Sequence, residues 1–245
     1  MTVDDVVPIT APASASIEVL AAGQPDLWFE LPPGFTEFDL GEDPEERMLR
    51  MVDAVDRLFA EVASEQKFGF VVAGEYALRT LIAAGAEHAS SCLLRMPDGR
   101  LSQGTLCVIV ENPVVGPEDQ DRRGVATRTA IQWREQDPDA EVGLIMLPYG
   151  PAAVCIRDQD LRIPGGIFGL NDSIPTSTRQ VQFCVPLRTS PGSALFTFMT
   201  EDVEHWAEYL EVVSGIMKSV SADEPDMESL QVSDSPDAGG TEGQI

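Results

Sequence analysis

The sequence has little positive charge and few histidines. Its 245 residues include two lysines, Lys67 and Lys218, and two histidines, and 16 basic residues stand against 41 acidic ones for a net charge of −25. No lysine or arginine precedes Arg47. A surface of this sign repels phosphate backbones and anionic lipid headgroups. We therefore expect a soluble protein with no nucleic-acid partner and no membrane partner.

Segments that direct a protein to a membrane or out of the cell are also missing. The first residues lack the basic stretch and the apolar core of a secretory signal. No apolar run approaches the roughly 18 residues that span a bilayer. The sequence therefore predicts a cytoplasmic location.

Paired cysteine motifs do not occur. The four cysteines, Cys92, Cys107, Cys155 and Cys184, each lie in an apolar, strand-like run, and no two of them form a C-x-x-C pair. A free cysteine packs as a small hydrophobe, whereas structural zinc needs closely spaced ligand pairs. We expect four reduced, buried thiols, no metal site and no cofactor.

Composition divides the chain into a folded part and two tails. With 43% hydrophobic residues, the chain can bury one sizeable core. Residues 1–25 are rich in Ala, Ser, Pro and Thr, and residues 221–245 are acidic and polar. Both compositions predict disorder, so residues 26–220 are expected to form a single domain.

Strand and helix signals alternate through residues 26–220 in an order that predicts an α+β fold. Strand pairs are predicted at 26–40 around Pro32-Pro33-Gly34, at 87–111 around Pro97-Asp98-Gly99, at 141–158 around Tyr149-Gly150, and at 179–199 around Ser190-Pro191-Gly192. Helices are predicted at 42–63, 75–85, 117–136 and after Thr200. Neighbouring hairpins imply an antiparallel sheet, and helices between them imply an α/β/α sandwich.

Local signals define several ends of these elements. Asp43 suits an N-cap, Gly85 suits a helix end in the left-handed region, and Pro186 predicts a sheet edge or a strand end. The buried side of the first helix is predicted from apolar residues at three- and four-residue spacing: Met48, Val52, Val55, Phe59 and Val62. The same spacing in the last helix selects Val203, Trp206, Leu210, Val213, Met217 and Val220.

The start of the last helix gathers Glu201, Asp202, Glu204 and His205 within one turn. Thr200 can cap this helix, and acidic residues oppose the positive end of its dipole. An acid–base site needs side chains that converge in a pocket, which spacing alone does not provide. We therefore interpret the cluster as a helix start.

His88 and Cys92 are four residues apart in one predicted strand, on the same face. At about 3.3 Å per residue they are roughly 13 Å apart, too far for direct proton transfer. No other pair of residues suggests a nucleophile and its base. The sequence therefore predicts no catalytic residues.

About twenty residues separate the predicted strands on either side of the glycine-rich stretch “IPGGIFGL”, and “RDQDL” before it is interpreted as a solvated turn. The stretch lacks the Lys-Ser/Thr of a phosphate-binding loop and is followed by no helix signal. Segment 161–178 is too apolar for a solvated linker. It either folds back onto its own core or forms a partner contact. The candidate partner-binding residues are Leu161, Ile163, Ile167, Phe168 and Leu170.

Arginines are densest in one predicted helix, at Arg122, Arg123, Arg128 and Arg134. The acidic segment 221–245 is a candidate to dock there. The alternative is that both stay solvated, because exposed ion pairs contribute little individually.

Four stretches resemble the PsbP-like α/β/α sandwich group: “LWFELPPGF”, “MPDGRLSQGTLCVIV”, “MLPYGPAAV” and “FTFMTEDVEHWAEYLEVVSGIMKSV”. This group includes LpqN-type lipoproteins and effector-associated secretion chaperones, and the chain also resembles a set of actinobacterial proteins. The resemblance implies a sandwich fold that binds other proteins without catalysis. This chain departs from the pattern because it has no lipoprotein signal and carries segment 161–178.

These observations predict a non-enzymatic, cytoplasmic adaptor that binds another protein, with a chaperone or accessory factor for a secreted partner as its more specific form. A small-molecule or lipid-binding module is the first alternative, and it requires an apolar cavity between sheet and helices. An enzyme of unrecognised chemistry is the second. It requires His88 or His205 to lie within hydrogen-bond reach of a cysteine or carboxylate in a cleft.

Overall fold

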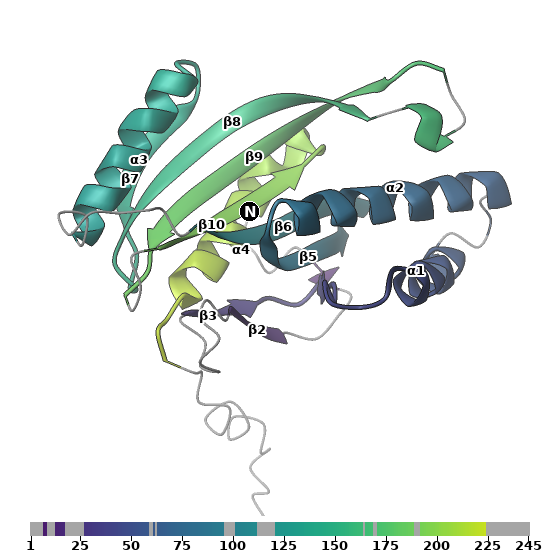
Figure 1. The fold of residues 1–245 in the computed structure, drawn as a ribbon, viewed down its shortest axis with the longest axis horizontal. Helices are drawn as coiled ribbons and strands as arrows, with labels where there is room; N and C mark the ends of the chain where they lie inside the picture. Colours follow the sequence, from purple (N-terminus) through teal and green to yellow (C-terminus); the bar gives the residue numbers. More distant parts are fainter. Residues whose placement is uncertain are drawn as a thin grey trace, which may run out of the picture.

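The computed structural model describes residues 7–8, 13–17, 27–58, 61, 63–95, 101–111, 121–163, 165–168, 171–188 and 192–223. These residues form an antiparallel sheet with helices packed on it (Figure 1), which confirms the predicted α+β class. The helices are α1 (Pro44–Leu58), α2 (Ser64–Ala83), α3 (Arg122–Gln136) and α4 (Trp206–Ser219), with short 3-10 turns η3 (Gly165–Phe168) and η4 (Val203–His205).

The main sheet has the strand order β1-β5-β6-β10-β9-β8-β7, and β4 pairs with β5 beside β1. A second sheet contains β2 and β3. The strands are β1 (Val7–Pro8), β2 (Ala13–Ile17), β3 (Leu27–Leu31), β4 (Phe35–Glu37), β5 (Ala86–Arg95), β6 (Leu101–Glu111), β7 (Glu141–Met146), β8 (Pro151–Ile163), β9 (Ile174–Pro186) and β10 (Ser193–Thr200).

Three of the four predicted strand pairs are antiparallel neighbours: β5 with β6, β7 with β8, and β9 with β10. The turn at Tyr149-Gly150 is confirmed, because Leu147 and Gly150 exchange backbone hydrogen bonds of 2.9 and 3.0 Å. The predicted turn residues 97–99 and 190–191 lie outside the described residues.

The first predicted pair, within residues 26–40, is wrong. A turn does follow β3, with Phe35 N–H donating to Pro32 O at 3.4 Å. The two strands then diverge: β3 pairs with β2, whereas β4 pairs with β5. Turn chemistry indicated the change of direction correctly, but the partners come from elsewhere in the chain.

Two strands lie inside residues 1–25, which were predicted to be a disordered tail. All five residues of β2 pair with β3, and Val7 and Pro8 of β1 pair with Arg95 and Leu94. The prediction of disorder therefore does not extend to β1 and β2. At the other end, Ser221 exchanges two backbone hydrogen bonds of 2.9 Å with Trp28, one residue beyond the predicted domain boundary.

Helix signals were correct at single ends and less so along whole helices. Asp43 accepts a 2.8 Å hydrogen bond from Glu45 N–H at the start of α1, and Gly85 adopts φ +82° after α2. However, α2 begins at Ser64, eleven residues before the predicted helix 75–85. Val52, predicted to be buried, is 38% exposed, and Arg47 is the buried residue of α1 instead. Phe59 and Val62 lie outside the described residues.

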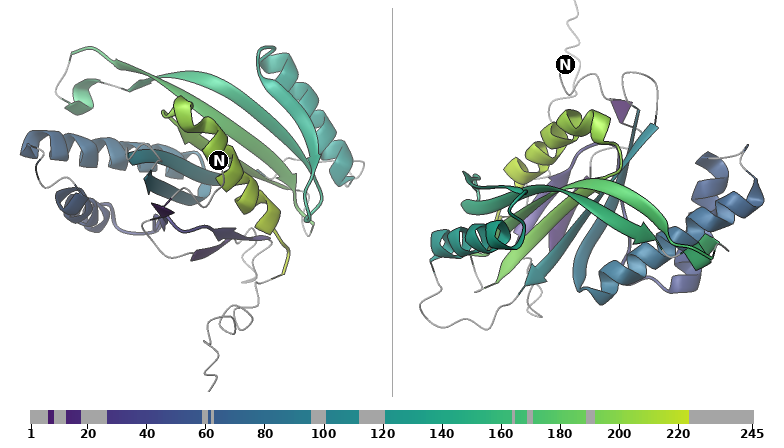
Figure 2. Two further views of the ribbon diagram at one scale, coloured as in Figure 1. Left: turned by 180° about the vertical axis from the view of Figure 1, so that it is seen from behind. Right: turned by 90° about the horizontal axis from the view of Figure 1, so that it is seen from above.

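Helices cover both faces of the sheet (Figure 2). On one face, α4 and β3 pack against the main core, to which α4 contributes Tyr209, Val213, Ile216 and Met217. On the opposite face, α3 packs its Ala130 against Ala153 and Cys184. The predicted stripe of α4 is largely confirmed, although Val203 is 44% exposed in η4.

About half of the long loop expected around segment 161–178 is strand. The structure extends β8 to Ile163 and starts β9 at Ile174, so the intervening segment is about half as long as predicted. “RDQDL” is therefore not a solvated turn. Polar pairs across the two strands support the extension, since Ser177 Oγ donates to Asp160 Oδ1 at 3.0 Å. Pro186 was expected at a sheet edge or at the end of a strand. β9 lies inside the sheet and ends at Pro186, so the strand end is confirmed.

Candidate functional site

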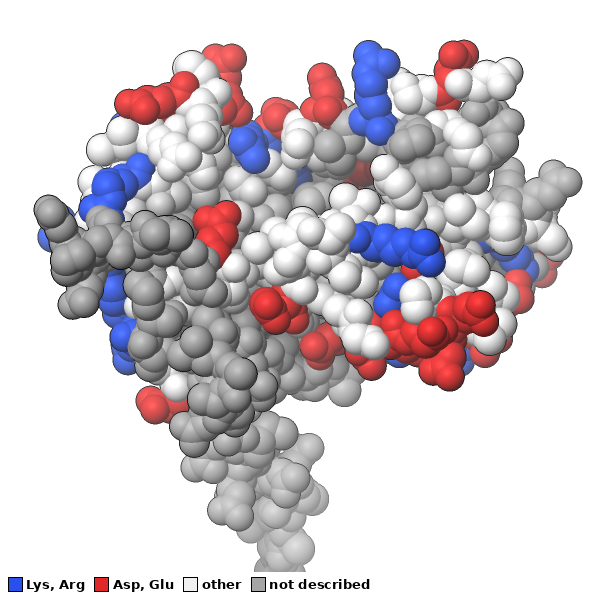
Figure 3. Space-filling model, in the orientation of Figure 1, with Lys and Arg blue, Asp and Glu red and all other residues white. Residues whose placement is uncertain are grey.

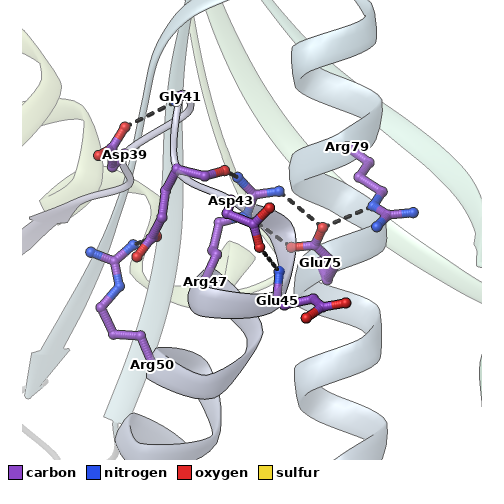
Figure 4. Close-up of polar contacts among 9 residues, drawn as sticks. Asp39, Gly41, Asp43, Glu45, Arg47, Arg50, Glu75 and Arg79 are labelled. Atoms are coloured by element: carbon purple, nitrogen blue, oxygen red, sulfur yellow. Dashed lines mark hydrogen bonds and ion pairs between the residues drawn. The ribbon is translucent and has the colours of Figure 1, made fainter.

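A buried polar cluster joins α1 to α2 (Figure 4). Arg47 is 2% exposed, and its Nε and Nη2 donate to the two carboxylate oxygens of Glu75 at 2.8 and 2.9 Å. Arg47 Nη1 also donates to the Glu42 carbonyl at 3.0 Å. This two-point contact connects residues that are 28 positions apart in the sequence, and it sets the register between the two helices.

Further charges extend this cluster to the surface. Arg79 Nε donates to Glu75 Oε1 at 2.8 Å, and Arg50 pairs with the Glu42 carboxylate. The hydrogen bond from Arg47 lowers the pKa of Glu75 and, together with Arg79, outweighs the opposing effect of burial. The same bond raises the pKa of Arg47. The pair therefore stays ionised, and it fixes α1 against α2.

Two aromatic side chains project from the helix that this pair holds in place. Phe68 is 64% exposed and Tyr76 is 49% exposed, and with the half-buried Val72 they follow one line of i, i+4 neighbours along α2. Eight residues at 1.5 Å each place the two rings about 12 Å apart. We refer to Phe68, Val72 and Tyr76 as the α2 ridge. Large exposed aromatic side chains on an ordered helix are typical of contact surfaces.

The charge around the helical hairpin formed by α1 and α2 is predominantly negative. Figure 3 shows acidic side chains gathered over the region of α1. The acidic residues of α1 and of the segment before it are Asp39, Glu42, Asp43, Glu45, Glu46, Asp53 and Asp56. An apolar ridge on α2 and an acidic helix packed against α2 favour a partner that is apolar at its centre and basic at its rim.

The predicted partner-binding segment lies next to the same helix. Leu161 and Ile163 belong to β8, and Ile167 and Phe168 belong to η3, which lies against α2 (Figure 1). The side chains of these four residues, and the whole of Leu170, lie outside the described part of the chain. Their role in binding therefore stays a prediction. The structure adds that the backbone of η3, which includes Ile167 and Phe168, is close to α2.

A hollow of about 580 Å³ lies between the end of β4, the start of α1 and the start of β5. It is lined by Glu37, Phe38, Asp39, Leu40, Gly41, Arg50, Ala86 and Glu87. Carboxylates and backbone groups dominate this lining, so it differs from the apolar cavity that a lipid-binding module requires.

Both histidines contact a carboxylate. His88 Nδ1 lies 3.2 Å from Glu37 Oε1, and its Nε2 lies 3.0 Å from Ser90 Oγ. His88 is only 2% exposed, and its ring packs edge-on against Phe29 with centroids 5.1 Å apart. Ser90 is fully buried. Substrate cannot reach a hydroxyl in that position, so His88 and Ser90 form a satisfied buried polar pair, and Glu37, whose side chain is 49% exposed, contacts the ring from the surface.

At the start of the last helix, His205 Nδ1 lies 2.9 Å from Asp202 Oδ2. Thr200 Oγ1 accepts from Asp202 N–H at 3.0 Å and donates to the Gln103 carbonyl at 2.7 Å. Burial disfavours the charged form of Asp202, but hydrogen bonds from Ser102 and His205 outweigh it and lower its pKa. Thr200 thus organises this junction, but the prediction that it caps the last helix is wrong, because the N-cap residues are Asp202 for η4 and His205 for α4.

Sequence reasoning missed one contact at this junction. Ser102 Oγ and Tyr209 Oη are 2.6 Å apart, and both residues are buried. The phenol satisfies a serine that faces the core from β6. Tyr209 lies among the residues of the predicted apolar stripe of α4. It directly precedes Leu210 and lies one helical turn before Val213, and this position was the only sequence signal that Tyr209 is buried.

The four cysteines are free and buried, as predicted. Burial raises the pKa of Cys92 to about 12 and that of Cys107 to about 11, and it also raises those of Cys155 and Cys184. Thiols in this state are poor nucleophiles. Within the described ranges, no three His, Cys, Asp or Glu side chains are grouped closely enough to hold a metal ion. No helix in the described part of the chain is long and apolar enough to cross a membrane.

Comparisons with known proteins add no family. No protein-family model matches the sequence, and no curated protein matches it. One solved structure, from Bacteroides thetaiotaomicron, is similar over 81% of this chain with a TM-score of 0.32 and 9% identity. The matched region is 45% of that longer chain, so this chain spans less than half of its length.

Proposed function

We propose that this is a non-enzymatic, protein-binding protein of the adaptor type, and that it contacts its partner through the α2 ridge and the neighbouring tip of the β8–β9 hairpin. The observation that supports this most directly is the exposure of Phe68 and Tyr76, 64% and 49%, on a helix fixed by the buried Arg47–Glu75 pair.

The energetic reason lies in the aromatic rings. Burying an aromatic side chain removes a large apolar area from water, and tyrosine is among the residues that most often dominate binding energy at interfaces. The Arg47–Glu75 contact holds α2 against α1 before any partner arrives. A surface that is ordered in advance loses less conformational entropy on binding.

The charge of the hairpin restricts the kind of partner. The helix α1, which packs against α2, is rich in acidic residues, and the whole chain carries a net charge of −25. A polypeptide with an apolar face flanked by Lys or Arg is complementary to this surface, and its association should weaken as salt screens the charges. A chaperone or accessory factor for a secreted partner is the more specific form of this proposal. It is supported by the sequence resemblance alone.

The test uses site-specific photo-crosslinking in cells that produce the protein. A photoreactive phenylalanine analogue replaces Phe68 or Tyr76 in the full chain, and Ile131 in a control. Ile131 is a matched position because it is 51% exposed on α3, at the other end of the sheet. We expect one defined crosslinked species from positions 68 and 76 and none from position 131.

A second arm measures capture of the crosslinked partner by the Phe68→Asp and Ile131→Asp variants. A charge on the ridge should reduce capture at least tenfold, since an aromatic anchor contributes about 2 kcal/mol or more, roughly thirtyfold. The Ile131→Asp variant should retain wild-type capture. Equal capture by both variants, or equal crosslinking from all three positions, contradicts the proposed surface.

A further inference from the structure

A second group of charges lies at the opposite end of the sheet and takes no part in the proposed contact surface. Arg122 begins α3, and Arg188 follows β9, yet both guanidinium groups converge on Tyr149 in the β7–β8 turn. Their Cζ atoms each lie 4.8 Å from the centre of its ring. We refer to Arg122 and Arg188 as the arginine pair.

Hydrogen bonds hold the arginine pair in place. Nη2 of each arginine donates to the Tyr149 carbonyl at 2.9 Å, so the two Nη2 atoms are at most about 6 Å apart. Arg122 Nε also donates to the Pro186 carbonyl at 3.1 Å, and Tyr149 Oη accepts from Arg188 N–H at 3.1 Å. Three chain segments therefore keep two positive charges beside each other.

Gly150 leaves the space that this arrangement needs. Its φ is +145°, and a Cβ at this position would lie 2.5 Å from Arg122 Nη2. A side chain here would push Arg122 away from the Tyr149 carbonyl. The geometry of the turn and the position of the first arginine are therefore linked.

Among the residues that the structure describes, no carboxylate pairs with either arginine of the arginine pair. Other described arginines, such as Arg47, Arg50, Arg79 and Arg179, contact carboxylates. Neither Arg122 nor Arg188 has a carboxylate within 4.0 Å among the described residues, and the Nη1 group of each has no hydrogen-bond partner there. Burial lowers the pKa of Arg122, and the charge of Arg188 lowers it further. In a chain with 41 acidic residues, this uncompensated pair of charges stands out.

We propose that the arginine pair is a binding site for an oxyanion, a phosphate or carboxylate group that accepts hydrogen bonds from both guanidinium groups. Guanidinium groups match the oxygen geometry of these anions and bind them with charge-assisted hydrogen bonds. Arg188 is exposed and Arg122 half-buried, so the anion has access from solvent. The turn carbonyls already position both side chains, which lowers the ordering cost of binding.

Two sources can supply such a group. One is a free anion such as inorganic phosphate. The other is the chain itself, because residues 224–245 contain six acidic residues and no basic ones. Figure 1 places the end of α4 at the same end of the molecule as the β7–β8 and β9–β10 turns. From Asp223, 22 residues at up to about 3.3 Å each can reach the arginine pair.

The experiment follows the arginine Nε–Hε signals of the full chain by NMR while inorganic phosphate is added at constant ionic strength, with chloride as the reference anion. We expect saturable shifts of the Arg122 and Arg188 signals with phosphate only. Arg188→Gln should weaken phosphate binding roughly tenfold, because it removes charge-assisted hydrogen bonds. Arg162→Gln, which alters an exposed arginine at the other end of β8, should leave binding unchanged.

A further variant distinguishes the two sources. It replaces the six acids of residues 224–245 by their amides: Glu224, Asp226, Glu228, Asp234, Asp237 and Glu242. If the chain occupies its own site, this variant should bind phosphate more tightly than wild type, and its arginine signals should shift before phosphate is added. If the site takes a free anion, both proteins should bind phosphate equally. The absence of saturable shifts in both proteins, with unchanged arginine signals, overturns the proposal and leaves the α2 ridge untouched.

Discussion

The Arg47–Glu75 pair gives the sharpest stability prediction, and Glu75→Gln is the change that tests it. Glutamine keeps the length of the side chain and one oxygen acceptor, but it removes the charge and one of the two hydrogen bonds from Arg47. Arg47, at 2% exposure, would then be a buried cation without a carboxylate. It would keep one hydrogen bond to the glutamine oxygen and the 3.0 Å bond to the Glu42 carbonyl.

The expected cost is about 3 kcal/mol. Removing one partner of a buried pair costs about 3–5 kcal/mol, and we take the lower end because the pair lies in an outlying helical hairpin beside the sheet core. Losing the exposed contact with Arg79 adds at most about 0.5 kcal/mol. For a domain of about 200 residues, this corresponds to a fall in Tm of roughly 6–12 °C.

The assay is urea unfolding at pH 7, followed by tryptophan fluorescence and far-UV circular dichroism. Arg50→Gln is the matched control, because it removes the more exposed ion pair with Glu42 and should cost less than about 1 kcal/mol. The double replacement Arg47→Met with Glu75→Leu should restore much of the lost stability, since an apolar pair needs no charge compensation. A Glu75→Gln variant that is destabilised no more than Arg50→Gln refutes this reasoning.

Three further outcomes follow from the same structure. The pKa of Glu75 is held below its ordinary value of 4.5, so its ionised form contributes stability above that pH, and this stability is lost as the pH falls through the lower folded-state pKa. In urea titrations below about pH 5, wild type should therefore lose stability more steeply than Glu75→Gln. Parallel slopes for the two proteins contradict this. Tyr209→Phe removes the 2.6 Å contact with Ser102 and should cost about 1 kcal/mol in the same unfolding assay, whereas an unchanged midpoint argues that the serine finds another partner. The pKa values of the four buried thiols are all raised, so these thiols should resist a thiol reagent at pH 8 in the native protein and react fully in urea. A thiol that reacts as fast in the folded protein as in urea contradicts this prediction.

Features that depend on a few consecutive residues could be predicted from the sequence. Asp43 caps α1, Gly85 takes a positive φ after α2, and the Tyr149-Gly150 turn joins β7 to β8. Each rests on a local preference of the backbone, such as the freedom of glycine at positive φ or the acceptor of an aspartate next to open N–H groups. The α+β class followed because several such signals agreed.

Features that depend on distant partners could not be predicted. The divergence of β3 and β4 depends on β2 and β5, and nothing within residues 26–40 specifies those partners. The apolar spacing of α1 pointed to Val52, which is 38% exposed, whereas the buried Arg47 owes its position to Glu75, a residue of another helix. The candidate contact surface was missed for the same reason, since Phe68 and Tyr76 have the spacing of core residues and only the packing of α2 leaves them exposed.

Because β7 is the last strand of the main sheet, its outer backbone groups are open to pairing with another chain. Arg134, on α3, limits this by donating to the carbonyl of Val142 at 2.9 Å. An incoming strand that needed this acceptor would first have to displace a guanidinium group. Leu144 and Met146 on the same strand are 49% and 73% exposed, so the edge also presents apolar side chains. One arginine on a neighbouring helix thus helps to keep copies of this protein from joining edge to edge.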